Sequence, residues 1–139
     1  PVSIWFFFDA GIFFTFGGLW GAEVVMVEAA ASPLPELLDP EVGACVAGHL
    51  SSQGIEHEEV RWFIPHQANR RIIDAVGQRL EIPEGHTYVN VDRYGNTSAA
   101  SVPIGLDELN RDGRIEDGDI VLMSAFGSGL TWGAGVMRW

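Results

Sequence analysis

The sequence predicts a layered α/β domain built on a mixed sheet. Short apolar runs typical of strands alternate with amphipathic stretches typical of helices through the second half of the chain. Two further apolar runs close the chain, separated by the Gly-Ser-Gly turn at residues 127–129. With 139 residues, of which 47% are hydrophobic, the chain can form one globular core. Strands that alternate with helices and end in an antiparallel pair favour a mixed sheet covered by helices.

The first part of the chain predicts one strand, one loop and one helix. Residues 24–27, VVMV, are expected to form a short buried strand. Residues 30–36 contain two prolines and mark the clearest change in composition, so we expect a loop there. An amphipathic helix is expected over residues 37–53, where Gly54 would end it.

From residue 60 onward the pattern becomes regular. Residues 60–64, VRWFI, predict a strand, and residues 87–91, TYVNV, predict another from their alternation. Between them the spacing predicts a helix from about residue 67 to residue 80. Its apolar positions share one face: Ala68, Ile72, Val76 and Leu80.

A last helix and two closing strands complete the domain. The helix is expected over residues 98–110, capped by the hydroxyls of Thr97 and Ser98. Pro103 fits this helix only if its first turn starts late or if the helix is kinked. The remaining expected elements are a turn-rich loop and two strands, at residues 112–119, 120–126 and 130–139.

Charge and composition exclude several classes of partner and site. The net charge is -11, and all eight basic residues are arginines, so neither nucleic acid nor an anionic membrane surface is expected as a partner. The aromatic start, residues 1–20, is interrupted by Asp9 and by glycines and has no basic flank, so we expect neither a spanning helix nor a signal peptide. One cysteine, Cys45, excludes an internal disulfide, and four scattered histidines predict no zinc site.

Two polar residues stand where a predicted strand gives way to a predicted helix. His66 lies in WFIPHQANRR and Asn96 in YGNTSAAS, and the carboxyl ends of strands are where α/β sheets bind ligands. A helix N-terminus disfavours imidazolium, so His66 should be neutral and able to donate one N–H, as the amide of Asn96 also can. Two such donors aimed at one point would stabilise an oxyanion. Both residues could equally be structural, with Asn96 as a cap and His66 as a strand-end side chain.

Three longer stretches favour the functional interpretation. WFIPHQANRRIIDAVGQRL, DRYGNTSAASVPIGLDE and GDIVLMSAFGSGLTWGAGVMRW together resemble the C-terminal half of a 3-oxoacyl-[acyl-carrier-protein] synthase III, which has a thiolase-like fold. The resemblance covers residues 60–139, and residues 37–59 fit the preceding helix of that family less specifically. It implies a C-terminal domain at residues 37–139, and it leaves residues 1–36 as an atypical apolar segment, a candidate remnant of the N-terminal half.

The resemblance implies a cytoplasmic acyltransferase of fatty acid biosynthesis. It would condense an acyl-CoA with malonyl carrier protein by decarboxylation, without a metal or other cofactor. His66 and Asn96 match the residues that bind the malonyl thioester oxygen as it becomes an enolate. Gln67, Ala68, Asn69, Arg70 and Arg71 match the segment that docks the acyl carrier protein, although Arg70 could simply lie on a solvated helix face. The backbone N–H of Ser128 matches an oxyanion donor for the acyl thioester.

One departure from the family concerns the nucleophile. The family's active cysteine lies in its N-terminal half, whereas Cys45 precedes the HQAN motif, where a structural thiol is expected. We therefore expect this chain to be inactive alone and to need a missing N-terminal half or a homodimer partner. The aromatic residues 4–20 are a candidate for part of the surface that would contact it. Two alternatives remain: a non-catalytic binding or assembly module on the same fold, and a polyketide-type starter condensing enzyme.

Overall fold

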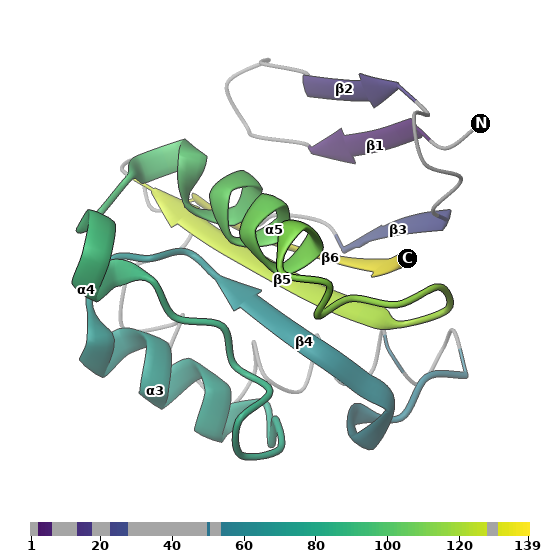
Figure 1. The fold of residues 1–139 in the computed structure, drawn as a ribbon, viewed down its shortest axis with the longest axis horizontal. Helices are drawn as coiled ribbons and strands as arrows, with labels where there is room; N and C mark the ends of the chain where they lie inside the picture. The colour runs from purple at the N-terminus through teal and green to yellow at the C-terminus, as the bar shows by residue number, and fades with distance from the viewer. Residues whose placement is uncertain (1–2, 7–13, 18–22, 28–49, 51–53, 128–130) are drawn as a thin grey trace.

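A mixed four-stranded sheet forms the centre of the computed structural model, which describes residues 3–6, 14–17, 23–27, 50, 54–127 and 131–139 (Figure 1). The strand order is β3 (Glu23–Val27), β6 (Thr131–Arg138), β5 (Ile120–Gly127) and β4 (Val60–Pro65). The β4 and β5 strands are parallel, whereas β5–β6 and β3–β6 are antiparallel. The mixed sheet and the closing hairpin predicted from the sequence are thus confirmed.

Alternate residues of the strands face two separate cores. On β4, Phe63 belongs to one apolar cluster while Trp62 and Ile64 belong to the other, as the two-residue period of a strand requires. The same alternation occurs on β5, where Leu122 and Met123 enter different clusters. A sheet that is apolar on both faces must be covered on both.

Two helices provide this cover (Figure 1). The α3 helix (Arg70–Arg79) buries Val76 in the cluster that contains Phe63, and α5 (Ser101–Arg111) buries Val102 and Leu109 in the cluster that contains Ile64. The layers are therefore helix, sheet, helix, which confirms the predicted architecture. A 3₁₀ turn, η1 (His57–Glu59), leads into β4.

The expected strand at residues 87–91 is wrong. Only Thr87 pairs with β4, by a parallel bridge to Phe63, and the chain then enters the short helix α4 (Val91–Tyr94). The cause is a competing set of hydrogen bonds, because the backbone N–H groups of Asn90 and Val91 donate to the Gln67 side chain. These hydrogen bonds turn the chain away from the extended conformation that the alternation of polar and apolar residues at 87–91 predicted.

The last helix also departs from its predicted start. A 3₁₀ turn, η2 (Ser98–Ala100), precedes α5, and neither Thr97 nor Ser98 caps a helix with its hydroxyl. Thr97 instead shares a hydrogen bond of 3.0 Å with the Ser101 hydroxyl. The late start places Pro103 in the first turn of α5, where its missing N–H leaves no helical hydrogen bond unmade.

The N-terminal elements are three short strands. β1 (Ser3–Phe6) and β2 (Phe14–Gly17) form a separate two-stranded antiparallel sheet, whereas the predicted strand at 24–27 is confirmed as β3. Residue 50 is helical, but the expected loop at 30–36 and the rest of the expected helix at 37–53 lie outside the described residues. No helix in the described part of the chain is long and apolar enough to cross a membrane. The same residues contain no cluster of three or more His, Cys, Asp or Glu side chains able to hold a metal ion.

Close packing between α5 and β4 gives a first prediction. A Cβ added at Gly105 would lie 2.8 Å from Ile64 Cγ2 and 3.1 Å from the Tyr88 ring, so Gly105→Ala should overpack this contact. Overpacking costs about 1–3 kcal/mol, and the better helix propensity of alanine returns about 1 kcal/mol. We expect a net loss of about 1 kcal/mol, within a range of about 0–2 kcal/mol, in the free energy of unfolding, measured by urea denaturation. Gly127→Ala, where the added Cβ meets open space, is the control; equal stability of both variants would contradict this packing.

Candidate active site

His66 lies directly after β4, at the carboxyl edge of the parallel strands. Its backbone N–H donates to the carbonyl of Ser124 on β5 at 2.7 Å, which extends the sheet by one residue. Only 8% of its surface is exposed, and its ring meets the Phe126 ring edge-on with centroids 4.8 Å apart. The sheet and an aromatic neighbour therefore hold the imidazole in one orientation.

The environment of His66 favours the neutral imidazole. Burial lowers the pKa of His66 below its ordinary value of 6.5, and a hydrogen bond to the backbone of Ser98 acts in the opposite direction. We expected the neutral form, but from proximity to a helix N-terminus. The physical cause differs, since α3 begins only at Arg70 and burial dominates. A neutral imidazole retains one N–H to donate near pH 7.

Asn96 lies in the exposed loop between α4 and η2. Its side-chain Oδ1 accepts a hydrogen bond of 2.9 Å from the backbone N–H of Ser98. His66 also interacts with the Ser98 backbone, so the two predicted site residues meet at one peptide segment. Ser98 has a φ of 54°, a left-handed conformation that is uncommon for residues other than glycine. Such strain costs about 1–3 kcal/mol and concentrates at functional sites.

Gln67 is a buried connection between two segments. Its Nε2 donates to the carbonyls of Pro65 at 2.9 Å and Tyr88 at 3.2 Å, and its Oε1 accepts from the N–H groups of Asn90 and Val91. These contacts use the full hydrogen-bonding capacity of the amide, and none of the residue is exposed. Gln67 therefore ties the end of β4 to the chain that leads to Asn96, and it offers no surface group to a carrier protein.

The rest of the predicted docking segment lies at the start of α3. Asn69 caps this helix by accepting from the Ile72 N–H at 3.0 Å, and the Ala68 N–H donates to the His66 carbonyl. Arg70 is exposed and pairs with Asp74 one turn later at 2.8 Å. Arg71 is also exposed, and none of the residues that the structure describes pairs with it. Arg71 is thus the cation of this segment that is available to an anionic partner.

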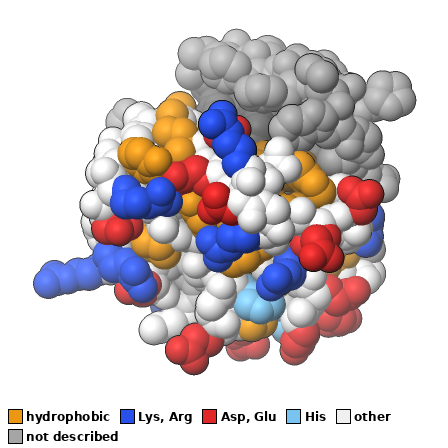
Figure 2. All heavy atoms as spheres, in the orientation of Figure 1, with side chains coloured by type: hydrophobic (Ala, Val, Ile, Leu, Met, Phe, Trp, Pro, Cys, Tyr) orange, Lys and Arg blue, Asp and Glu red, His pale blue; other side chains and the backbone are white. Residues whose placement is uncertain are grey.

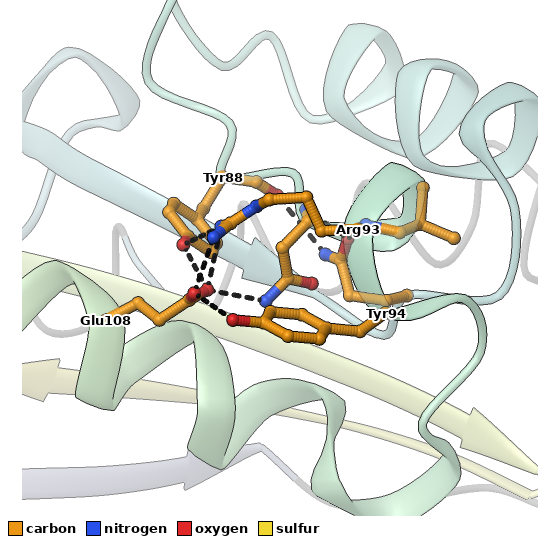
Figure 3. Close-up of polar contacts among 7 residues, drawn as sticks. Tyr88, Arg93, Tyr94 and Glu108 are labelled. Atoms are coloured by element: carbon orange, nitrogen blue, oxygen red, sulfur yellow. Dashed lines mark hydrogen bonds and ion pairs between the residues drawn. The ribbon is translucent and has the colours of Figure 1, made fainter.

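Glu108 on α5 is the centre of a network that the sequence did not reveal (Figure 3). Its carboxylate accepts hydrogen bonds from Tyr88, at 2.5 Å, and from Asn90, Arg93 and Tyr94. The only sequence signal is that Glu108 follows Gly105 by three residues and so shares its face of the helix. Its partners are 14 to 20 residues away in the sequence, so a local pattern does not reveal them.

The network changes the acidity of its members. Burial alone would raise the pKa of Glu108, but the hydrogen bonds from Asn90, Tyr88, Tyr94 and Arg93 outweigh it and lower the pKa to about 2. The stabilisation from this carboxylate is therefore complete above its ordinary pKa of 4.5 and is lost as the pH falls through about 2. Burial and the neighbouring Glu108 raise the pKa of Tyr88 to about 12. The stabilisation that the protonated Tyr88 hydroxyl gives the folded chain is therefore complete below its ordinary pKa of 10 and is lost as the pH rises through about 12.

Several residues singled out from the sequence, and the aromatic segment at residues 4–20, lie wholly or partly outside the residues that the structure describes. Ser128 and Cys45 fall outside the described residues, as do the side chains of residues 4–20. Among the large hydrophobic side chains that the structure describes, Tyr94 is exposed, at 50%. On the face shown in Figure 2, arginine and acidic side chains lie interspersed and do not form a field of one sign.

The mixed sheet between two helical layers matches part of solved 3-oxoacyl-[acyl-carrier-protein] synthase III structures, so the domain has a thiolase-like fold. A family model described as 3-oxoacyl-[acyl-carrier-protein] synthase III C terminal matches residues 50–139. The chain belongs to this family, as its resemblance predicted.

Individual relatives agree with this assignment. Beta-ketoacyl-[acyl-carrier-protein] synthase III of Brucella anthropi is 56% identical over 86 residues, which are 62% of this chain and 27% of the relative. The solved structure of the Thermus thermophilus synthase III has a TM-score of 0.63 at 45% identity, covering 77% of this chain and 34% of that one. The Aquifex aeolicus structure has a TM-score of 0.68 at 38% identity, covering 85% and 43%. This chain thus spans under a third of the length of the curated relatives that it matches.

Proposed function

We propose that residues 50–139 act as the C-terminal domain of a beta-ketoacyl-[acyl-carrier-protein] synthase III in fatty acid biosynthesis. The observation that carries this proposal is that His66, held at the carboxyl end of β4, lies near the Ser98 backbone, to which the Asn96 side chain is hydrogen-bonded. One residue comes from the rigid end of β4 and the other from a loop that follows it by thirty positions. In this proposal, the two side chains direct neutral N–H donors at one oxygen that gains negative charge.

The reaction in this proposal is a decarboxylative condensation. The bond between the malonyl carboxylate and its α-carbon breaks, carbon dioxide leaves, and the electron pair moves into the thioester enolate. His66 and Asn96 donate hydrogen bonds to the enolate oxygen. The α-carbon then attacks the acyl thioester carried on a cysteine, a carbon–carbon bond forms, and the thiolate leaves. No metal or other cofactor takes part, because the thioester oxygen itself receives the charge and two hydrogen-bond donors stabilise it.

Other parts of the chain would bind the substrates. The guanidinium of Arg71, which is exposed and has no partner among the described residues, is suited to the phosphopantetheine phosphate or to an acidic helix of the acyl carrier protein. The backbone N–H of Ser128 would stabilise the oxyanion formed on the acyl group delivered by acyl-CoA. The cysteine nucleophile would come from an N-terminal half of the kind that the longer relatives contain. A cytoplasmic location belongs to the same proposal.

The proposal predicts that the 139-residue chain has no condensing activity by itself. The reason is that Cys45 precedes β4 in the sequence, whereas the family's nucleophile belongs to the other half. Purified chain would be incubated with acetyl-CoA and malonyl carrier protein, and ketoacyl product would be followed by mass spectrometry. Turnover that disappears in Cys45→Ala would contradict the proposal and identify Cys45 as the nucleophile.

A hybrid synthase tests the function itself. In this protein, residues 50–139 of the chain replace the matching part of the Brucella anthropi relative, with which the chain is 56% identical over 86 residues. Formation of ketoacyl product by the hybrid synthase is the expected result. A hybrid that folds and contains its cysteine, yet forms no product, would instead favour a binding or assembly module.

A further inference from the structure

Asn96 presents a problem of positioning. A donor that stabilises an oxyanion must already point at the reacting oxygen, because reorientation during the reaction removes much of its effect. Asn96, however, is exposed and lies in a loop whose neighbours Gly95 and Ser98 have φ values of 67° and 54°. Neither a helix nor a strand holds this residue, so another part of the molecule must do so.

Glu108 contacts the chain immediately before Asn96. The Arg93 guanidinium grips both carboxylate oxygens, with Nη1 2.7 Å from Oε1 and Nη2 2.9 Å from Oε2. The Tyr94 hydroxyl donates to Oε1 at 2.8 Å. Arg93 and Tyr94 are three and two positions before Asn96, so both contacts fix the end of α4 from which the loop departs.

The same carboxylate also holds the segment that enters α4. Tyr88 donates to Oε2 at 2.5 Å and Asn90 Nδ2 donates to Oε2 at 2.9 Å. Figure 3 shows the side chains of Tyr88, which precedes α4, and of Arg93 and Tyr94, at its C-terminal end, turned toward Glu108. The Glu108 side chain is only 17% exposed, although its partner Arg93 is 50% exposed. One partly buried carboxylate therefore connects both ends of α4 to α5.

We propose that Glu108 is a positioning residue for Asn96, holding α4 so that the Asn96 amide faces the oxygen that His66 also contacts. The catalytic part of this inference rests on the proposed function, whereas the structural part does not. Glu108 itself touches no reacting atom and acts only through Arg93, Tyr94 and the loop that they anchor. Its loss should consequently loosen a local segment more than it weakens the fold.

Hydrogen exchange on the full 139-residue chain tests the structural part. In Glu108→Ala, the amides of Tyr94, Gly95 and Ser98 should exchange at least about ten times faster, while those of β4 and β5 keep their protection. Asp107→Ala is the matched control, since among the described residues the Asp107 side chain pairs with Arg111 alone, at 3.0 Å on the exposed side of the same helix. If Glu108→Ala fails to fold, the same exchange measurement is made on Glu108→Gln, because this variant keeps the size of the side chain and loses its charge. Unchanged exchange in the loop, or equal acceleration everywhere, would overturn the inference.

Kinetics of the hybrid synthase test the catalytic part. Glu108→Gln should lower kcat by about ten-fold with little change in KM, because Asn96 acts on charge that develops only in the transition state. Combining it with Asn96→Ala should cost no more than Asn96→Ala alone, since both changes remove the same donor. Additive losses would overturn the positioning role. An unmodified hybrid that is inactive would instead contradict the proposed function, and the exchange experiment would still decide the role of Glu108.

Discussion

Replacing His66 with alanine in the hybrid synthase should lower kcat by about 10²- to 10³-fold, the usual effect of removing one oxyanion donor. The ring is fixed by the sheet and by Phe126, so its N–H is oriented before substrate arrives. KM should change little, because the lost hydrogen bond strengthens only as the enolate forms. Steady-state rates with malonyl carrier protein and acetyl-CoA would measure both constants.

The control for this experiment is a histidine on the same domain but outside the site. His57 lies in η1 and approaches Glu81 at 4.0 Å, so His57→Ala should retain the parent activity. Asn96→Ala should show a loss similar to that of His66→Ala. A His66→Ala variant that folds and keeps its rate within two-fold would remove His66 from the mechanism, whatever the result for Asn96.

The second large effect is on stability, at Gln67. Gln67→Met keeps the length of the side chain but removes four hydrogen bonds, and it leaves two buried carbonyls and two N–H groups without this partner. A buried polar group that loses its partner costs about 1–3 kcal/mol, so we expect a total loss of about 3 kcal/mol or more in the free energy of unfolding. Urea denaturation of the 139-residue chain provides the measurement.

Gln78 provides the matched comparison for this substitution. It is exposed on α3, and Gln78→Met should change the free energy of unfolding by less than about 0.5 kcal/mol. A loss in Gln67→Met no larger than that in Gln78→Met would mean that the Gln67 contacts do not hold the chain together. The connection between β4 and the Asn96 loop would then need another explanation.

Hydrophobic patterning predicted most of the sheet. Residues 60–64, 120–126 and 130–139 are apolar runs with clear boundaries, and such runs have few alternatives to a buried strand. Residues 87–91 have the same alternation, but Gln67 captures the backbone at Asn90 and Val91. A tertiary hydrogen bond thus overrides a local pattern, and no window of sequence around residue 87 contains that information.

The candidate site was only partly visible in the sequence. His66 and Asn96 could be found because a polar residue at a strand–helix junction is unusual and because the surrounding motifs resemble a known family. Glu108 could not, because a glutamate in an amphipathic helix is ordinary and its meaning comes from the four side chains that meet it. The neutral state of His66 was predicted in the correct direction, although burial causes it.

The most direct test of the central claim is a crystal structure of the hybrid synthase with a stable malonyl-thioester analogue. We expect the thioester oxygen to lie about 2.7–3.1 Å from a ring nitrogen of His66 and from Nδ2 of Asn96. The Asn96 Oδ1 should keep its hydrogen bond to the Ser98 N–H, which is 2.9 Å in the free chain. An analogue whose oxygen contacts only one of the two side chains, or neither, would contradict the claim that they form one site.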